Sequence, residues 1–116
     1  MNIVITLNDA PYGSERNYQG LRMADAMLKL EEDLDLTLYL SNDAVACAKT
    51  GQQTPDGYYN VERMLKPIIR QGIVLVCRTC AEARGLTVDD LMEGVRLVTL
   101  GEAAEFILEA DKTLVY

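Results

Sequence analysis

Five short apolar runs recur along the chain, and segments with helical spacing separate them. The runs are rich in branched residues and predict β-strands at residues 2–7, 36–40, 73–76, 95–98 and 113–116. Buried strands that alternate with helices are typical of a parallel sheet with helices on both faces. The pattern therefore predicts an α/β fold, and the length of 116 residues favours a single domain over residues 1–116.

Apolar positions at helical spacing fill the longer gaps between these strands. One stripe, which includes Leu21, follows Ser14, and we expect Ser14 to be the N-cap. Another stripe follows Asn60, a second expected N-cap, and contains Pro67, where the helix should kink or end. A last stripe at residues 100–108 predicts a helix before the fifth strand.

Three shorter helices are predicted from residues that typically begin or end a helix. The first is capped by Ser41 or Asn42 and continues through Ala48. The second has Thr79 as the N-cap of a capping box and ends at Gly85, and the third extends from Thr87 to Gly94.

Polar residues gather where the first three strands end. In a parallel sheet the carboxyl ends of the strands meet along one edge, and functional groups collect there. This places the segments Asn8 to Ser14, Ser41 to Asp43 and Cys77 to Arg84 side by side. We expect polar groups of these segments to surround Cys77. The candidate substrate-binding residues are Asn8, Tyr12, Gly13, Ser14, Asn42, Arg78 and Arg84.

Charge and residue usage exclude several classes of function. The chain has 11 basic and 18 acidic residues, and its net charge of −7 disfavours binding to nucleic acids and to anionic membranes. Histidine is absent, which excludes Ser-His-Asp triads, Cys-His pairs and His-ligated metals within one chain. No glycine-rich phosphate-binding motif is present. We therefore expect neither a cofactor nor a metal site.

The N-terminal run and the cysteine count predict a compartment. The residues after Met1 lack the features of a signal peptide, and no apolar run approaches the length of a membrane span. Three cysteines are an odd number, which argues against a disulfide scaffold. These features predict a protein of the reducing cytoplasm.

The segment VCRTCAEARG, residues 76–85, contains two cysteines three positions apart at the end of a strand. A thiol at this point lies beside the free N–H groups and the positive dipole end of the following helix. Arg78 and Arg84 add positive charge nearby. We expect these groups to lower the pKa of Cys77, so that it reacts as a thiolate.

Three other interpretations of the pair stay open. In the first, Cys77 is a small buried hydrophobic residue at the end of a strand. A thioredoxin-like redox couple is a second interpretation, although none of the three prolines lies where that fold needs one. A zinc site shared between subunits is the third, since one chain lacks four ligands. We expect Cys47, within the apolar stretch AVACA, to lie in the core.

Five stretches together resemble the DsrE/DsrF-like family, most closely its YchN-like branch: NDAPYGSERNYQGLRMADAML, LYLSNDAV, GYYNVERML, VCRTCAEARG and ADKTLVY. They cover nearly the whole chain in order. The resemblance implies a three-layer α/β/α sandwich with a five-stranded parallel sheet, in agreement with the strand pattern. It also implies a homo-oligomer, either a trimer or a hexamer.

Some members of this family, of the DsrE and TusD type, are sulfur-relay proteins in which a cysteine at the end of this strand accepts sulfane sulfur as a persulfide. That cysteine lies eight residues before the glycine of an Arg-Gly pair, so the resemblance matches it to Cys77, with Arg84 and Gly85 as the pair. Cys80 resembles a second cysteine of the YchN-like branch that several relay proteins lack. The resemblance thus implies a cofactor-free, sulfurtransferase-like site with Cys77 and Cys80 as the catalytic residues, Cys80 either resolving the persulfide or packing.

Two functions from different classes follow from these observations. The first is a sulfur carrier that accepts sulfane sulfur on Cys77 and passes it to a partner protein. The second is a non-catalytic oligomeric binding or adaptor protein with the same fold. A redox sensor that uses Cys77 and Cys80 is a third interpretation. The exposure of Cys77 distinguishes the first two, because a carrier needs an accessible thiol.

Overall fold

Five parallel strands form one sheet in the computed structural model, which describes residues 1–116. Their order across the sheet is β4-β3-β2-β1-β5. This confirms the predicted parallel sheet and shifts the fifth strand by one residue toward the N-terminus. The strands are β1 (Asn2–Leu7), β2 (Asp35–Leu40), β3 (Ile73–Cys77), β4 (Arg96–Val98) and β5 (Lys112–Val115).

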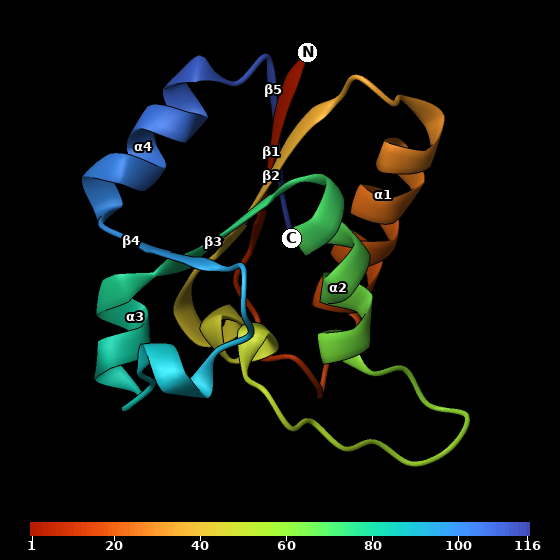
Figure 1. Cartoon of the computed structure of the whole chain (residues 1–116), viewed down its shortest axis with the longest axis vertical. Coiled ribbons are helices and arrows are strands. Elements are labelled where there is room, and N and C mark those ends of the chain that lie inside the picture. The colour runs from red at the N-terminus through yellow and green to blue at the C-terminus, as the bar shows by residue number, and fades with distance from the viewer.

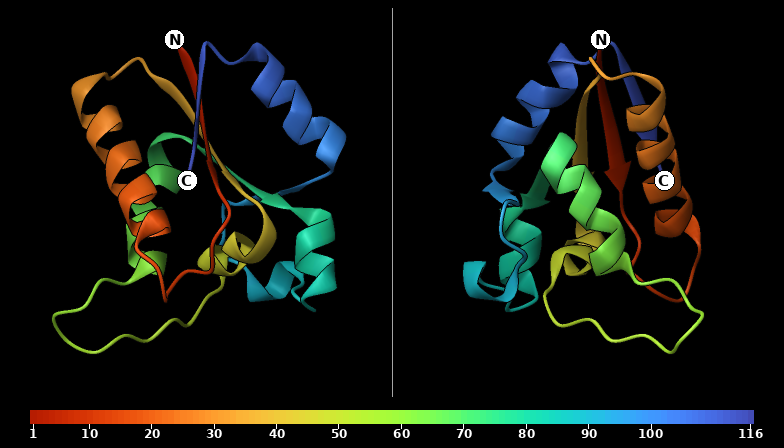
Figure 2. Two further views of the ribbon diagram at one scale, coloured as in Figure 1. Left: turned by 180° about the vertical axis from the view of Figure 1, so that it is seen from behind. Right: turned by 45° about the vertical axis from the view of Figure 1, so that its right-hand side comes forward.

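Helices cover both faces of the sheet and complete three layers (Figures 1 and 2). Helices α1 (Arg16–Leu30) and α2 (Val61–Gln71) pack together on one face. Helices α3 (Arg78–Ala83) and α4 (Leu100–Glu109) lie on the opposite side. The short 3₁₀ helices η1 (Asn42–Ala48) and η2 (Val88–Asp90) lie near the carboxyl ends of the strands.

The two faces of the sheet carry different residues because alternate residues of a strand point to opposite sides. Ile5 and Leu38 are register partners with no exposed surface. They lie on the same face as Leu7, which contacts α1 beside Gly20. The next residues along, Tyr39 and its register partner Leu75, point to the opposite face. Cys77 follows Leu75 by two positions, so it shares this second face with Tyr39.

Two expected boundaries of the long helices differ in the structure. Ser14 is not the N-cap of α1, because its hydroxyl donates to the carboxylate of Asp9 at 2.8 Å and the helix begins at Arg16. Pro67 does not end α2, which continues to Gln71. Fully buried apolar residues on either side of Pro67 hold α2 against the sheet, and this packing outweighs the backbone hydrogen bond that proline removes. These residues are Val61, Leu65 and Ile68.

The N-cap predictions elsewhere have mixed outcomes. Asn60 does cap α2, with its side chain accepting the N–H of Arg63 at 3.0 Å. Thr79 does not cap α3, because the helix begins at Arg78 and Cys77, two residues before Thr79, occupies the N-cap position. The helix predicted from Thr87 to Gly94 is only the single turn η2.

Candidate functional site

The carboxyl ends of β1, β2 and β3 bring together the three polar segments that the sequence places there. The side-chain amide of Asn42, just after β2, donates to Oδ1 of Asn8, just after β1, at 2.9 Å. Arg84, just after α3, donates through Nε to Oδ1 of Asp43 at 2.9 Å. These side chains connect three loops that are 34 and 41 residues apart in the chain.

Cys77 is both the last residue of β3 and the N-cap of α3. The backbone N–H of Cys80 donates to the sulfur of Cys77 at 3.4 Å. The sulfur of Cys80 in turn accepts the backbone N–H of Asn42 at 3.3 Å. Cys77 is 6% exposed, whereas Cys80 is half-buried, so solvent reaches the pair mainly from the Cys80 side.

Tyr39 completes this site on the sheet face that Cys77 shares. Its ring is buried, and its hydroxyl lies within hydrogen-bonding reach of Cys77 and Ser41. Burial and the hydrogen bond to Cys77 raise the pKa of Tyr39 to about 12. The hydroxyl therefore stays protonated and able to donate at neutral pH. We call Tyr39, Asn42, Cys77 and Cys80 the thiol cluster.

Sequence reasoning missed Tyr39 because it lies within an otherwise apolar strand. The signal that identifies it is the alternation of side chains between the two faces of the sheet. Residues at the ends of neighbouring strands share a face when they are register partners or lie two positions from a register partner.

Opposing effects set the pKa of Cys77. Burial raises this pKa. Hydrogen bonds from the thiol and the backbone N–H of Cys80, and from the hydroxyls of Tyr39 and Thr79, lower it. The combined effect of the hydrogen bonds is larger than that of burial. The pKa of Cys77 is therefore below that of an ordinary thiol. A thiolate is the nucleophilic form of cysteine, so the site favours the reactive form.

The two arginines near the pair do not act as the sequence suggested. Arg84 forms an ion pair with Asp43, at 2.8 Å from Nη2 to Oδ1, and also donates to the carbonyl of Cys80 at 2.9 Å. Arg78 is exposed and forms no ion pair; the pKa of Glu102 is lowered mainly by hydrogen bonds from Thr99, and the charge of Arg78 adds a smaller contribution. The lowered pKa of Cys77 comes instead from hydrogen-bond donors.

The remaining candidates at the end of β1 hold other parts of the chain. The hydroxyl of Tyr12 donates to Gln52 at 2.6 Å and accepts the N–H of Val61 at 3.0 Å. Gly13 adopts a φ of 106° in the turn. These contacts secure the segment 49–60, which extends from the body of the molecule in Figure 1. Tyr12 thus secures a neighbouring loop and Ser14 bonds to Asp9 within its own turn, and neither forms a hydrogen bond to the thiols.

Cys47 lies in the core, as the sequence predicts. It has no exposed surface, and its sulfur accepts the side-chain amide of Asn17 at 3.3 Å. Burial raises its pKa to about 12 despite this hydrogen bond. Asn17 was not recognised in the sequence; its amide also donates to the carbonyls of Asp9 and Ala10 and fixes the turn after β1.

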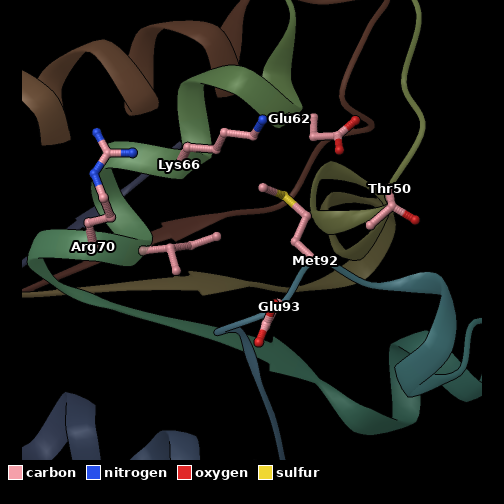
Figure 3. Close-up of a pocket in the computed structure, with 7 residues that line it drawn as sticks. Thr50, Glu62, Lys66, Arg70, Met92 and Glu93 are labelled. Carbon is pink, nitrogen blue, oxygen red and sulfur yellow. The ribbon is translucent and has the colours of Figure 1, made fainter.

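A separate hollow of about 300 Å³ lies between α2 and the segment before β4 (Figure 3). Lys66 and Arg70, one helical turn apart on α2, line one wall, and Met92 and Glu93 line the facing wall. Neither basic side chain forms an ion pair within the chain. The hollow contains no residue of the thiol cluster, so any ligand there lies apart from the sulfur chemistry.

No group of three or more Cys, Asp or Glu side chains is placed to hold a metal ion. None of the helices is both long enough and apolar enough to cross a membrane.

Comparison with known proteins fits this geometry. The model of the DsrE/DsrF-like family matches residues 1–116. The chain belongs to the DsrE/DsrF-like family. This family is generally related to sulfur relay. Among its relatives, protein YchN of Escherichia coli K12 is 43% identical over 115 residues, which cover 98% of this chain and 97% of YchN. The uncharacterized protein MJ0989 of Methanocaldococcus jannaschii is 35% identical over 117 residues, with full coverage of both chains.

Two solved structures show the same architecture. The crystal structure of YchN from E. coli superposes with a TM-score of 0.94 at 42% identity, over 99% of this chain and 98% of YchN. The structure of MTH1491 from Methanobacterium thermoautotrophicum, a protein of unknown function, superposes with a TM-score of 0.81 at 14% identity over the same shares. The second match shows the fold alone. The first confirms the predicted α/β fold with a five-stranded parallel sheet.

Proposed function

We propose that this DsrE-family protein is a sulfur carrier that accepts sulfane sulfur as a persulfide on Cys77 and passes it to a partner protein. The observation that carries the proposal is the set of hydrogen-bond donors on the Cys77 sulfur, which lower its pKa although the side chain is buried. A buried structural thiol behaves in the opposite way, and Cys47 is the example within the same chain. Free thiols on all three cysteines fit the reducing cytoplasm in which we place this activity.

The transfer follows the rules of thiol–disulfide exchange. The Cys77 thiolate attacks the outer sulfur of a donor persulfide, forming a new S–S bond as the donor's own S–S bond breaks. The donor cysteine leaves as a thiolate with the electron pair of that bond. In the second half, a thiolate of the acceptor attacks the outer sulfur on Cys77, and Cys77 leaves as a thiolate. No electrons are gained or lost overall, so the reaction needs no cofactor.

Residues around Cys77 stabilise its thiolate both before loading and after transfer. The N–H of Cys80 is fixed by the first turn of α3, and the hydroxyl of Tyr39 is fixed by burial in the sheet. Donors held in place in this way stabilise charge on sulfur without reorganisation during the reaction. The ion pair of Arg84 with Asp43 connects the end of α3 to η1 and holds these two segments together.

Sulfur loading tests the proposal. The reduced protein is incubated with a cysteine desulfurase and cysteine, and intact-mass spectrometry measures bound sulfur on the wild type, Cys77→Ser and Cys80→Ser. At the earliest time after mixing we expect one added sulfur atom that is absent only from Cys77→Ser. Cys47→Ala is the matched control, and it should load like the wild type. An adduct that survives in Cys77→Ser would contradict the assignment of the persulfide.

We propose that this carrier assembles as a homo-oligomer, either a trimer or a hexamer. Large apolar side chains remain exposed on α4 and on β5, the strand at one edge of the sheet: Leu100, Ile107, Leu108 and Val115. A second copy of the chain would bury them. Analytical ultracentrifugation should show that Leu108→Glu dissociates the assembly. Leu30→Glu, at an equally exposed leucine on α1, should leave it intact.

The alternative is a non-catalytic binding or adaptor protein. The observation that favours it is the 6% exposure of Cys77, which limits access to large donors. An adaptor requires no reactive thiol, so failure of every form to load sulfur, with unchanged self-association, would support this second function.

A further inference from the structure

We propose that Cys80 gives the Cys77 persulfide a second outlet: attack by Cys80 closes a Cys77–Cys80 disulfide and releases the sulfur as hydrosulfide. This inference rests on the proposed persulfide at Cys77. It adds a product class, inorganic sulfide, and a role for the second thiol.

The positions of the two cysteines suit disulfide closure. Cys77 is the N-cap of α3 and Cys80 is the third residue of the helix. Residues three apart on a helix have Cβ atoms roughly 5–6 Å apart, and the Cβ atoms of a disulfide lie roughly 3.5–4.5 Å apart. The backbone N–H of Cys80 already contacts the sulfur of Cys77 at 3.4 Å. Closure therefore requires the first turn of α3 to bring the two Cβ atoms closer by roughly 1–2 Å, and the sheet can stay in place.

Cys80 has the surroundings of an attacking thiol. The N–H of Asn42 donates to its sulfur at 3.3 Å and stabilises negative charge there. Asn42 has a φ of 53°, in the left-handed region, and its side chain is tied to Asn8 at 2.9 Å. These constraints aim the N–H at Cys80. Since Cys80 is also more exposed than Cys77, solvent helps to carry its charge.

The step balances in atoms and electrons. The sulfur of Cys80 forms a bond to Sγ of Cys77, and the bond from that Sγ to the outer sulfur breaks. The outer sulfur leaves with the electron pair and takes up the proton of Cys80, so it departs as hydrosulfide. The sulfane sulfur gains two electrons, and the two cysteines lose them as they form the disulfide. A dithiol reductant then restores both thiols.

Attack on the outer sulfur of the persulfide transfers that sulfur, whereas attack on the inner sulfur releases it. A partner thiolate that attacks the outer sulfur accepts it and frees Cys77. Cys80 attacks the inner sulfur, which is part of the same helical turn. An intramolecular attack needs no encounter, and groups held in this way reach high effective concentrations. The loaded protein is therefore expected to release sulfide when no acceptor is bound.

Anaerobic loading with inorganic polysulfide tests the release. The reduced protein receives one equivalent of sulfane sulfur, and hydrosulfide and intact mass are followed over time. The wild type and the control Cys47→Ala should release one equivalent of hydrosulfide more than Cys80→Ser. Their mass should fall by two hydrogens, whereas Cys80→Ser and Cys80→Ala retain the added sulfur. A dithiol reductant should permit a second equal round in the wild type.

Different failures have different meanings. If Cys80→Ser and Cys80→Ala fold but take up no sulfur, the persulfide at Cys77 is wrong and the proposed function fails with it. If they take up sulfur and the wild type keeps its adduct equally long, the carrier stands and the release is overturned. Release that persists in Cys77→Ser would also overturn it, because the disulfide cannot form in that variant.

Discussion

The backbone N–H of Cys80 donates to the sulfur of Cys77 at 3.4 Å, so the second cysteine of the pair supports the first through its main chain. A substitution of the Cys80 side chain leaves this donor in place. The Cys80 thiol is the largest of the influences that lower the pKa of Cys77, and it is removed by Cys80→Ala. The two contributions of one residue can therefore be separated by experiment.

We expect Cys77 to react with iodoacetamide at a lower pH than an ordinary thiol does. Hydrogen bonds from Cys80, Tyr39 and Thr79 are the cause. Tyr39→Phe removes one donor and should raise the pKa of Cys77, so alkylation at pH 7 becomes slower. Mass spectrometry of alkylated peptides over a pH series measures this. Tyr12→Phe is the matched control, since its hydroxyl binds Gln52 and Val61 instead. An equal effect of both substitutions would contradict the role of Tyr39.

Alkaline pH should destabilise the protein through Cys47. Burial raises its pKa from 9.0 to about 12, so the folded state keeps a proton that the unfolded state loses. This stabilisation is complete below pH 9 and declines between pH 9 and about 12. The decline corresponds to about 4 kcal/mol of unfolding free energy. Tyr39 acts in the same direction, from 10.0 to about 12.

Urea unfolding at several pH values above 8 measures this decline. Cys47→Ala lacks the titrating thiol and should lose less stability than the wild type over the same interval, although its stability at pH 7 is lower because of the cavity. Parallel curves for the two proteins would show that the Cys47 thiol does not govern alkaline unfolding.

Gly20→Ala should destabilise the protein by about 1–3 kcal/mol, although alanine is the better helix former. A Cβ at Gly20 would lie 2.5 Å from Leu7 Cδ2 and 3.1 Å from the ring of Tyr116. Leu7 is fully buried and has little room to move. Gly101→Ala, on α4, is the control: its Cβ would meet nothing nearer than 3.9 Å. It should be neutral or stabilising by less than about 1 kcal/mol. Thermal unfolding compares the two, and equal effects would rule out close packing at Gly20 as the cause.

Asn60→Ala should cost about 1–2 kcal/mol of unfolding free energy, because it removes the N-cap of α2. The same side chain donates to the carbonyl of Gln52 at 3.1 Å, so the substitution also loosens the segment 49–60. Asn60→Asp keeps an oxygen for the N–H of Arg63 and should cost less. Chemical unfolding gives the two free energies, and limited proteolysis reports on the segment. A larger loss for the aspartate variant would show that the cap is not the main contribution.

The sheet could be predicted from the sequence because its three central strands are mostly apolar runs that are buried on both faces. The meeting of Asn8, Asn42 and Cys77 followed from the same rule, since parallel strands end at one edge. Helix boundaries were harder to predict where a local signal competes with a contact across space. Ser14 has the chemistry of an N-cap, but Asp9 accepts its hydroxyl instead.

Two features of the site depended on information that a single sequence does not carry. The role of Tyr39 depends on strand register, which places it beside Cys77. The role of Arg84 depends on its partner Asp43, which is remote in the chain. Charge near a cysteine in sequence was therefore a poor guide to the charge that its sulfur experiences.

The sulfur of Cys77 is also the acceptor that caps α3. Once a second sulfur is attached, the negative charge moves outward and the N–H of Cys80 faces a weaker acceptor. If Cys77 carries a persulfide as proposed, loading would alter the start of a helix whose far end is tied to η1 through Arg84 and Asp43. The surface around the site would then differ between the loaded and the empty protein, and a docking protein would have a physical means of distinguishing them.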